Sequence, residues 1–159
     1  MTIKVGDRLP EATFTTPTED GPKPVTTAEV FGGKTVALFA VPGAFTPTCD
    51  ARHLPGFIDN AAAFRAKGVD TIACVSVNDV FVMKAWAKAS PGSEAILFLA
   101  DGNADFAGKL GLELDASKFG MGKRSQRYSM LVVDGVVKQL NVEEGGFELS
   151  TAEHLLGQL

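Results

Sequence analysis

The sequence contains little cysteine, with only Cys49 and Cys74 among its 159 residues. This excludes a disulfide-rich secreted scaffold. At this length folding hides about 70% of the surface that the unfolded chain exposes, so stability requires neither disulfides nor metals. Residues 1–10 carry charged side chains and no apolar run, so no secretory signal is expected. We therefore expect two reduced thiols, each with a catalytic, redox or inert core role.

The sequence also lacks a long hydrophobic run and an excess of positive charge. Its most apolar stretches, Thr35–Phe45 and Ala95–Ala100, fall short of the roughly 18 residues that a spanning helix needs. Fifteen Lys and Arg oppose nineteen Asp and Glu, a net charge of −4. The only basic cluster, Lys123, Arg124 and Arg127, is too small for a nucleic-acid surface. We expect neither a membrane nor a nucleic-acid partner, and a cytoplasmic location, or an organelle if a targeting peptide has been removed.

No repeat, low-complexity tract or linker divides the chain, so we expect one domain over residues 1–159. Short apolar runs at 35–41, 71–77 and 96–99 predict buried strands. An apolar stripe after Asn78-Asp79 predicts a helix that ends at Ser90-Pro91-Gly92. Asp134-Gly135 predicts a hairpin between 127–133 and 136–142, and capping-box spacing at 150–153 predicts a final short helix. The pattern is typical of an α/β fold with a mixed sheet and flanking helices.

The segment 42–50 carries the strongest functional signal. It follows a predicted strand and leads into a helix-forming stretch, with Thr46 as a potential N-cap and Pro47 as the first helical residue. Cys49 then lies in the first turn, where free amides and the helix dipole favour a thiolate and should lower the thiol pKa from about 8.5. These features favour a reactive cysteine over the alternative of an inert, buried one.

Arg127 opens a predicted strand and shares a face with Ser129 and Leu131, so its guanidinium could hold a thiolate or a polarised oxygen substrate. It could equally reach solvent or pair with a carboxylate, and Arg124 competes for the same role. Cys74 lies mid-strand, too far along the chain from Cys49 for a C-x-x-C motif, and an inert core position is favoured for it.

His53 lies four residues after Cys49, which suggests a Cys–His nucleophile pair or a metal site. Both ideas are weak, because Pro55-Gly56 should interrupt the helix and the only other histidine is His154. No compact Cys/His cluster supplies zinc ligands. We expect a polar structural role for His53, and neither metal nor organic cofactor.

The stretches Pro42–Cys49 and His53–Phe57 closely resemble the peroxiredoxins, specifically the type II or peroxiredoxin-five-like subgroup. Further matching segments, spread over nearly the whole chain, are 5–7, 67–70, 76–79, 81–86, 110–115 and 124–128. The resemblance implies a thioredoxin-like fold and a thiol peroxidase that acts on hydrogen peroxide and alkyl hydroperoxides.

The resemblance also implies a role for each active-site residue. Pro42 would shield the pocket, the Thr46 hydroxyl would bond the peroxide or thiolate, Cys49 would attack, and Arg127 would stabilise the charge. The Arg-aromatic-Ser-Met pattern at 127–130 favours Arg127 over Arg124. Cys49 would become a sulfenic acid while water or an alcohol leaves. A homodimer is implied by the resemblance alone.

The recycling step stays open at the level of sequence. Some relatives carry a second cysteine where Cys74 stands, which makes it a candidate resolving residue, although a buried strand argues against this. Otherwise glutathione with glutaredoxin, or thioredoxin, would reduce Cys49. An alternative function is a peroxide-sensing relay or holdase that uses the same cysteine. A thioredoxin-like disulfide reductase is disfavoured, because the chain has no C-x-x-C.

Overall fold

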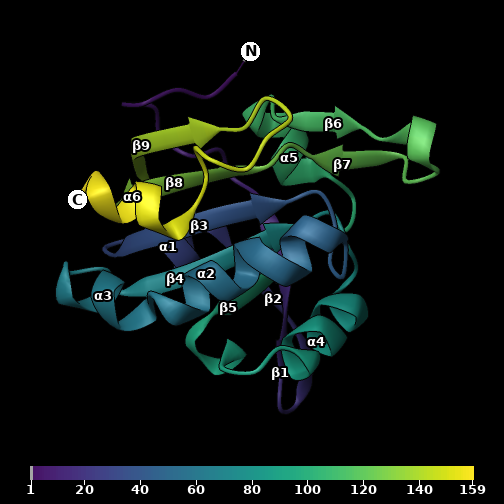
Figure 1. Ribbon diagram of the computed structural model, residues 1–159, viewed down its shortest axis with the longest axis horizontal. Coiled ribbons are helices and arrows are strands. Elements are labelled where there is room, and N and C mark those ends of the chain that lie inside the picture. The colour runs from purple at the N-terminus through teal and green to yellow at the C-terminus, as the bar shows by residue number, and fades with distance from the viewer. Residues whose placement is uncertain (1) are drawn as a thin grey trace.

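The computed structural model describes residues 2–159, which form a seven-stranded sheet in the order β2-β1-β5-β4-β3-β8-β9 (Figure 1). The parallel strands β3, β4 and β5 lie in the middle, and antiparallel strands lie on both sides, so the sheet is mixed. The strands of this sheet are β1 (Thr13–Thr18), β2 (Gly21–Thr26), β3 (Thr35–Val41), β4 (Thr71–Ser76), β5 (Leu97–Ala100), β8 (Tyr128–Val133) and β9 (Val136–Val142). A separate two-stranded hairpin consists of β6 (Glu113–Asp115) and β7 (Lys123–Ser125).

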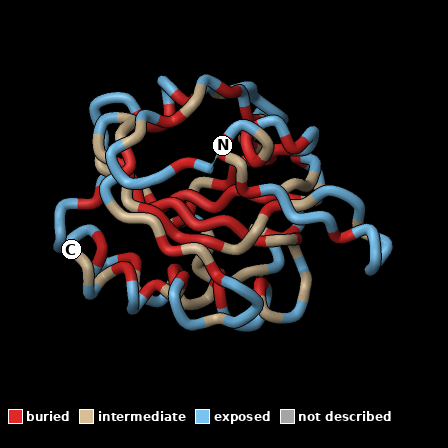
Figure 2. Tube along the Cα trace, turned by 90° about the horizontal axis from the view of Figure 1, so that it is seen from above, coloured by how far each residue is buried: buried red, intermediate tan, exposed pale blue. Residues whose placement is uncertain are grey.

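The helices cover both faces of the sheet. They are α1 (Thr27–Phe31), α2 (Leu54–Asp59), α3 (Ala61–Ala66), α4 (Val80–Ala89), α5 (Asp105–Leu110) and α6 (Ala152–Gly157), with a π-helical turn at Cys49–His53 and 3₁₀ turns at Ser93–Ala95 and Ser117–Phe119. Alternating side chains of β3 pack into two hydrophobic cores, one on each face of the sheet. Leu38 packs with α1 and α5 residues on one face, and Phe39 packs with residues of α2, α3, α4 and α6 on the other. Buried strands lie between exposed loops in Figure 2.

The predicted α/β fold is confirmed, as are most of the predicted elements. The strand at 35–41 has the predicted bounds, and those beginning at Thr71 and Ile96 differ by one residue at one or both ends. Asp79 caps α4 by accepting a hydrogen bond from the Val82 amide. Both residues of the Asp134-Gly135 turn have positive φ, at 48° and 78°, as a two-residue hairpin turn requires.

Three local predictions were wrong. Pro55 and Gly56 do not interrupt a helix but lie in the first turn of α2, where a missing N–H costs little. Thr151, not Ser150, caps α6, because Ser150 is hydrogen-bonded to Glu143 instead. Arg127 lies just before β8 rather than inside it.

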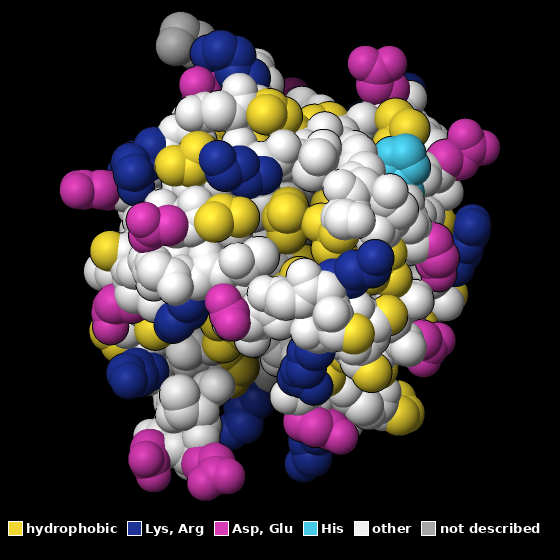
Figure 3. Space-filling model, turned by 90° about the vertical axis from the view of Figure 1, so that its left-hand side faces the viewer, with side chains coloured by type: hydrophobic (Ala, Val, Ile, Leu, Met, Phe, Trp, Pro, Cys, Tyr) yellow, Lys and Arg dark blue, Asp and Glu magenta, His cyan; other side chains and the backbone are white. Residues whose placement is uncertain are grey.

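The described part of the chain has no helix that is long and apolar enough to cross a membrane. On the face shown in Figure 3, cationic and anionic side chains are interspersed, and neither sign of charge forms a continuous stripe.

Candidate active site

Cys49 lies at the start of the helical segment that follows β3, and its side chain is fully buried. Helical structure begins at Pro47, and the Thr46 carbonyl accepts the first helical hydrogen bond from the Asp50 amide at 2.8 Å. Thr46 therefore occupies the predicted cap position. Its hydroxyl, however, donates to the Gly43 carbonyl at 2.7 Å rather than accepting from a helical amide. The next turn is π-helical, a rare conformation found often at functional sites.

Polar side chains form hydrogen bonds to the backbone of the loop between β3 and Cys49. The Ala44 amide donates to Asn78 Oδ1 at 2.9 Å, and Arg124 donates to the carbonyls of Pro42 and Val77 at 3.5 and 3.3 Å. Arg124 also donates to the Met121 carbonyl. Its guanidinium thus supports the backbone of the loop, and its hydrogen bonds do not include the sulfur of Cys49.

Arg127, by contrast, contacts Cys49 directly. Its Nη2 donates to Cys49 Sγ at 2.9 Å, and its Nη1 donates to His53 Nδ1 at 2.9 Å. The planar guanidinium therefore holds two groups at once, which a lysine ammonium could not do with the same geometry. The Phe147 ring lies nearby, with its centroid 5.7 Å from the guanidinium carbon.

His53 joins this cluster through both ring nitrogens. Because the guanidinium has only donors, Nδ1 must accept from Arg127, and Nε2 must therefore carry the proton and donate to the Ser150 carbonyl at 2.9 Å. Burial and the neighbouring Arg127 charge lower the pKa of His53 from its ordinary 6.5 to about 3, against the opposing effects of the Ser150 carbonyl and Glu143. His53 is thus a neutral hydrogen-bond acceptor at physiological pH.

This buried histidine predicts a loss of stability in acid. Between about pH 6.5 and 3 the unfolded chain binds a proton at His53 that the folded chain does not, so the free energy of unfolding falls as the pH falls. We expect a contribution of up to about 1.4 kcal/mol for each pH unit in this range. Urea unfolding of the wild type and of His53→Gln at several pH values measures it. Equal pH dependence in the two proteins would contradict the prediction.

Cys74 lies in the middle of β4, paired in register with Phe39 of β3, and belongs to the same core cluster as Cys49. Both thiols are free, and Cys74 is completely buried. Burial, followed by the nearby Cys49, raises the pKa of Cys74 well above its ordinary value, although Arg127 opposes this. A neutral, enclosed thiol is a poor nucleophile.

A cavity of about 700 Å³ is lined by Thr48, the residue before Cys49, and by Arg127, whereas Cys49 itself is buried and does not line it. Pro42, Thr48 and Arg127 contribute to its wall on the side of the loop and sheet. Phe147 and Arg52 also line the cavity, and the Arg52 guanidinium carbon is 4.6 Å from the centre of the Phe147 ring. Pro42 and Arg127 thus share one cavity wall with the residues around Cys49, and a small solute in the cavity would meet Arg127 donors.

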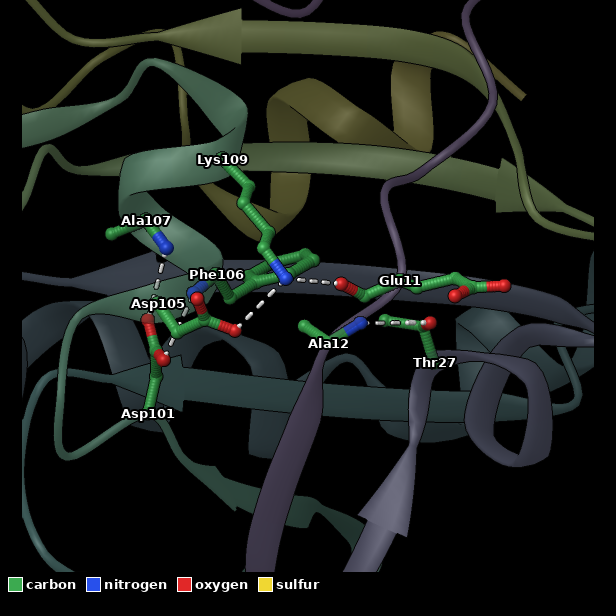
Figure 4. Close-up of polar contacts among 8 residues, drawn as sticks. All are labelled: Glu11, Ala12, Thr27, Asp101, Asp105, Phe106, Ala107 and Lys109. Carbon is green, nitrogen blue, oxygen red and sulfur yellow. Dashed lines mark hydrogen bonds and ion pairs between the residues drawn. The ribbon is translucent and has the colours of Figure 1, made fainter.

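A larger cavity of about 900 Å³ lies elsewhere, between β1, α1 and the start of α5 (Figure 4). Three of its charged side chains, those of Asp101, Asp105 and Lys109, have partners within the fold. Asp101 accepts from the amides of Phe106 and Ala107, and Lys109 pairs with Asp105 and donates to the Glu11 carbonyl. These contacts anchor α5, and none of the predicted site residues lines this cavity.

The structure thus brings together Cys49, Arg127 and Pro42, with Thr46 in the adjoining loop and Cys74 beneath them in the core. The sequence predicted only a polar structural role for His53, although its position four residues after Cys49 indicated that it lies near the site. Sequence reasoning missed Glu143 and Phe147 altogether, since nothing in the sequence places the 143–150 loop beside Cys49. Among residues 2–159, no group of three or more His, Cys, Asp and Glu is arranged to hold a metal ion.

Comparison with known proteins gives a consistent result. The Redoxin family model matches residues 4–156. The chloroplastic peroxiredoxin-2E-2 of Oryza sativa subsp. japonica is 54% identical over 164 residues, which cover 99% of this chain and 73% of that protein. Peroxiredoxin-2C of the same plant is 49% identical over 159 residues, which cover 99% of this chain and 98% of that protein.

Solved structures agree with these sequence relatives. Reduced Prx3 from Vibrio vulnificus, determined in complex with hydrogen peroxide, is 54% identical and superposes with a TM-score of 0.95 over 99% of both chains. Since the family model covers almost the whole chain and the relatives match nearly all of it, the chain belongs to the type II peroxiredoxins, enzymes that reduce a peroxide substrate at the expense of a thiol.

Proposed function

We propose that Cys49 is the peroxidatic nucleophile of this peroxidase and that Arg127 is its charge-stabilising partner. The single observation that carries the proposal is the 2.9 Å contact between Arg127 Nη2 and Cys49 Sγ at the start of a helical segment. The guanidinium directs a charged N–H donor at the sulfur that would carry out the attack. It also offers donors to an oxygen that gains negative charge during the reaction.

The proposed reaction is a two-electron oxidation of sulfur. The Cys49 thiolate attacks one peroxide oxygen, an S–O bond forms and the O–O bond breaks. The sulfur becomes a sulfenic acid, and the departing oxygen leaves as water or an alcohol after it takes up a proton. Because negative charge develops on the departing oxygen, preorganised donors from Arg127 lower the barrier.

Thr46 and Pro42 are proposed to shape the peroxide site. The Thr46 hydroxyl hydrogen is used by the Gly43 carbonyl, so its oxygen is oriented to accept a hydrogen bond from a peroxide O–H. Pro42 lines the same cavity as Arg127 and has no N–H to compete for the substrate. The apolar side chains of Leu114 and Phe147 in the same cavity favour entry of alkyl hydroperoxides as well as hydrogen peroxide.

We propose that an external thiol, glutathione with glutaredoxin or else thioredoxin, reduces the Cys49 sulfenic acid. The thiol attacks the sulfur and releases water, and a second thiol then frees Cys49 from the mixed disulfide. Complete burial in the central strand β4 argues against Cys74 as the resolving residue. Cys49 is buried too, so its π-helical turn must open locally for the reductant to reach it.

The reductant proposal predicts turnover without Cys74. We expect Cys74→Ala to keep its peroxide consumption within about twofold of the wild type when glutathione and glutaredoxin supply electrons, because no step uses that sulfur. The rate of peroxide consumption by the variant and the wild type is measured with glutathione and glutaredoxin, and separately with thioredoxin and its reductase. Loss of turnover with both reductants, in a variant whose Cys49 is still oxidised at the normal rate, would make Cys74 the resolving cysteine.

Three broader features complete the proposal. Residues 1–159 act as one domain, and the protein works in the cytoplasm, a location drawn from sequence alone. Two copies associate near the site, and two exposed aromatic residues, Phe45 and Phe81, support this. Phe45 belongs to the loop before Cys49. Its ring centroid is 6.4 Å from that of Trp86, which lies in α4 together with Phe81. The molar mass in solution tests this association.

A further inference from the structure

The Arg127 guanidinium is held by a closed ring of hydrogen bonds. His53 Nδ1 accepts from Arg127, and His53 Nε2 donates to the Ser150 carbonyl at 2.9 Å. The Ser150 amide and hydroxyl both donate to Glu143 Oε2 at 2.7 Å. The Glu143 amide then donates to the Arg127 carbonyl at 2.9 Å, which returns the ring to its starting residue.

Glu143 is the residue that joins the two halves of this ring. It follows β9 directly, is 8% exposed, and also accepts from the Glu148 amide at 2.9 Å. One carboxylate oxygen therefore gathers three donors from the 143–150 loop. Burial opposes its ionisation, but the hydrogen bonds from Ser150, Leu149 and Glu148 leave the pKa of Glu143 below its ordinary value.

In this ring Arg127 is next to His53, and Glu143 lies farther along. Glu143 contacts the loop and not the guanidinium, while the group that accepts from Arg127 is an uncharged imidazole. A carboxylate bonded directly to Arg127 would neutralise its charge and compete with the Cys49 sulfur. A neutral acceptor fixes the orientation of the guanidinium and leaves its positive charge for the sulfur and the peroxide.

We propose that Glu143 is a positioning residue for the peroxidase reaction, which acts through Ser150 and His53 to fix the Arg127 guanidinium against the Cys49 sulfur. The inference rests on the proposed function of Cys49 and Arg127. Glu143 does not touch the reacting atoms, so it is not a catalytic residue. Its effect depends on the Ser150 carbonyl, which fixes the protonated nitrogen of His53 and so leaves Nδ1 as an acceptor.

The test is a double-mutant cycle on the rate of Cys49 oxidation by hydrogen peroxide in a single turnover. We expect Glu143→Ala to slow this rate about tenfold, because an arginine that has lost its orientation positions charge less well. Glu143→Gln, which keeps an acceptor oxygen, should recover most of the rate. Glu148→Ala, which removes an exposed carboxylate from the same loop, should stay within about twofold of the wild type.

The cycle separates positioning from a general loss of structure. We expect His53→Leu to slow oxidation about tenfold or more, and Glu143→Ala to cost nothing further in that background, because the route from Glu143 to Arg127 is already broken. Nitrogen-15 NMR of the His53 ring supplies a spectroscopic signature. The wild type should show protonated Nε2, and Glu143→Ala should show a mixture of the two tautomers.

The outcomes also distinguish this inference from the proposed function. A normal rate in folded Glu143→Ala, or independent losses from Glu143→Ala and His53→Leu, would overturn the inference while leaving Cys49 as the nucleophile. A reactive Cys49→Ser variant would instead overturn the proposed function. Should Glu143→Ala fail to fold, His53→Asn and His53→Leu decide: Asn keeps an acceptor near Nδ1 and should react faster than Leu, and equal rates would refute the positioning role.

Discussion

Replacement of Cys49 with serine should lower the rate of peroxide reduction by at least about 10⁴-fold, because no other group on the proposed path can attack the peroxide oxygen. Serine has nearly the shape of cysteine, so the buried position beside Arg127 should still fold. Its hydroxyl is not a thiolate and has no adjacent base. Peroxide consumption with an excess of reducing thiol measures the loss, after correction for the uncatalysed reaction of that thiol.

Cys74→Ala is the matched control for this experiment. It also removes one buried sulfur, from the same core cluster, and its rate of Cys49 oxidation should stay close to that of the wild type. A Cys49→Ser protein that kept a tenth of the wild-type rate would exclude Cys49 as the nucleophile, and a folded Cys74→Ala protein that lost oxidation of Cys49 would show that Cys74 takes part in that step.

Replacement of Arg127 with lysine should lower kcat/KM for hydrogen peroxide by about 10²–10³-fold, the effect of removing one preorganised donor from a site of developing negative charge. Lysine keeps the positive charge but lacks the planar guanidinium with its several N–H donors. It cannot donate to Cys49 Sγ and His53 Nδ1 with the geometry that the guanidinium has here. Stopped-flow kinetics of Cys49 oxidation measures the change without interference from the reductant.

Arg65→Lys provides the control, because Arg65 is an exposed residue of α3. It should react within about twofold of the wild type. An Arg127→Lys protein with nearly full activity would show that positive charge alone is sufficient. The two hydrogen bonds of the guanidinium, to Cys49 and to His53, would then not be required for the reaction.

Most of the fold follows from local patterns in the sequence. The apolar segment 35–41 and the Asp134-Gly135 turn specify their own conformations, so β3 and the β8–β9 hairpin were predictable. The outer strands β1 and β2 were not, because Thr13–Thr18 and Gly21–Thr26 contain three prolines and little apolar alternation. The two strands pair with each other from Thr13↔Thr26 to Thr18↔Gly21, and β1 joins the rest of the sheet at Ala100 of β5, a contact that belongs to the tertiary structure.

The same distinction applies to the site. Cys49 and Thr46 belong to one continuous motif, so their proximity could be predicted. Arg127 lies just before β8, yet the predicted alternation with Leu131 gave the correct side, because Leu131 packs against the core cluster that contains Cys49. The position of His53 required tertiary information. Its Nδ1 is fixed by Arg127, 74 residues away, and its Nε2 by Ser150, 97 residues away. Sequence spacing suggested a direct pair with Cys49, whereas the contact runs through Arg127.

The most direct test of the account is the mass of the reduced protein before and after one equivalent of hydrogen peroxide, without added thiol. Peptide mapping then locates any new oxygen or disulfide. We expect a gain of one oxygen on Cys49 while Cys74 stays free, because Arg127, which donates to the Cys49 sulfur, lines the cavity, whereas Cys74 is enclosed in β4. A Cys49–Cys74 disulfide would contradict the external reductant, and an unmodified Cys49 would contradict the central claim that this sulfur reacts with peroxide.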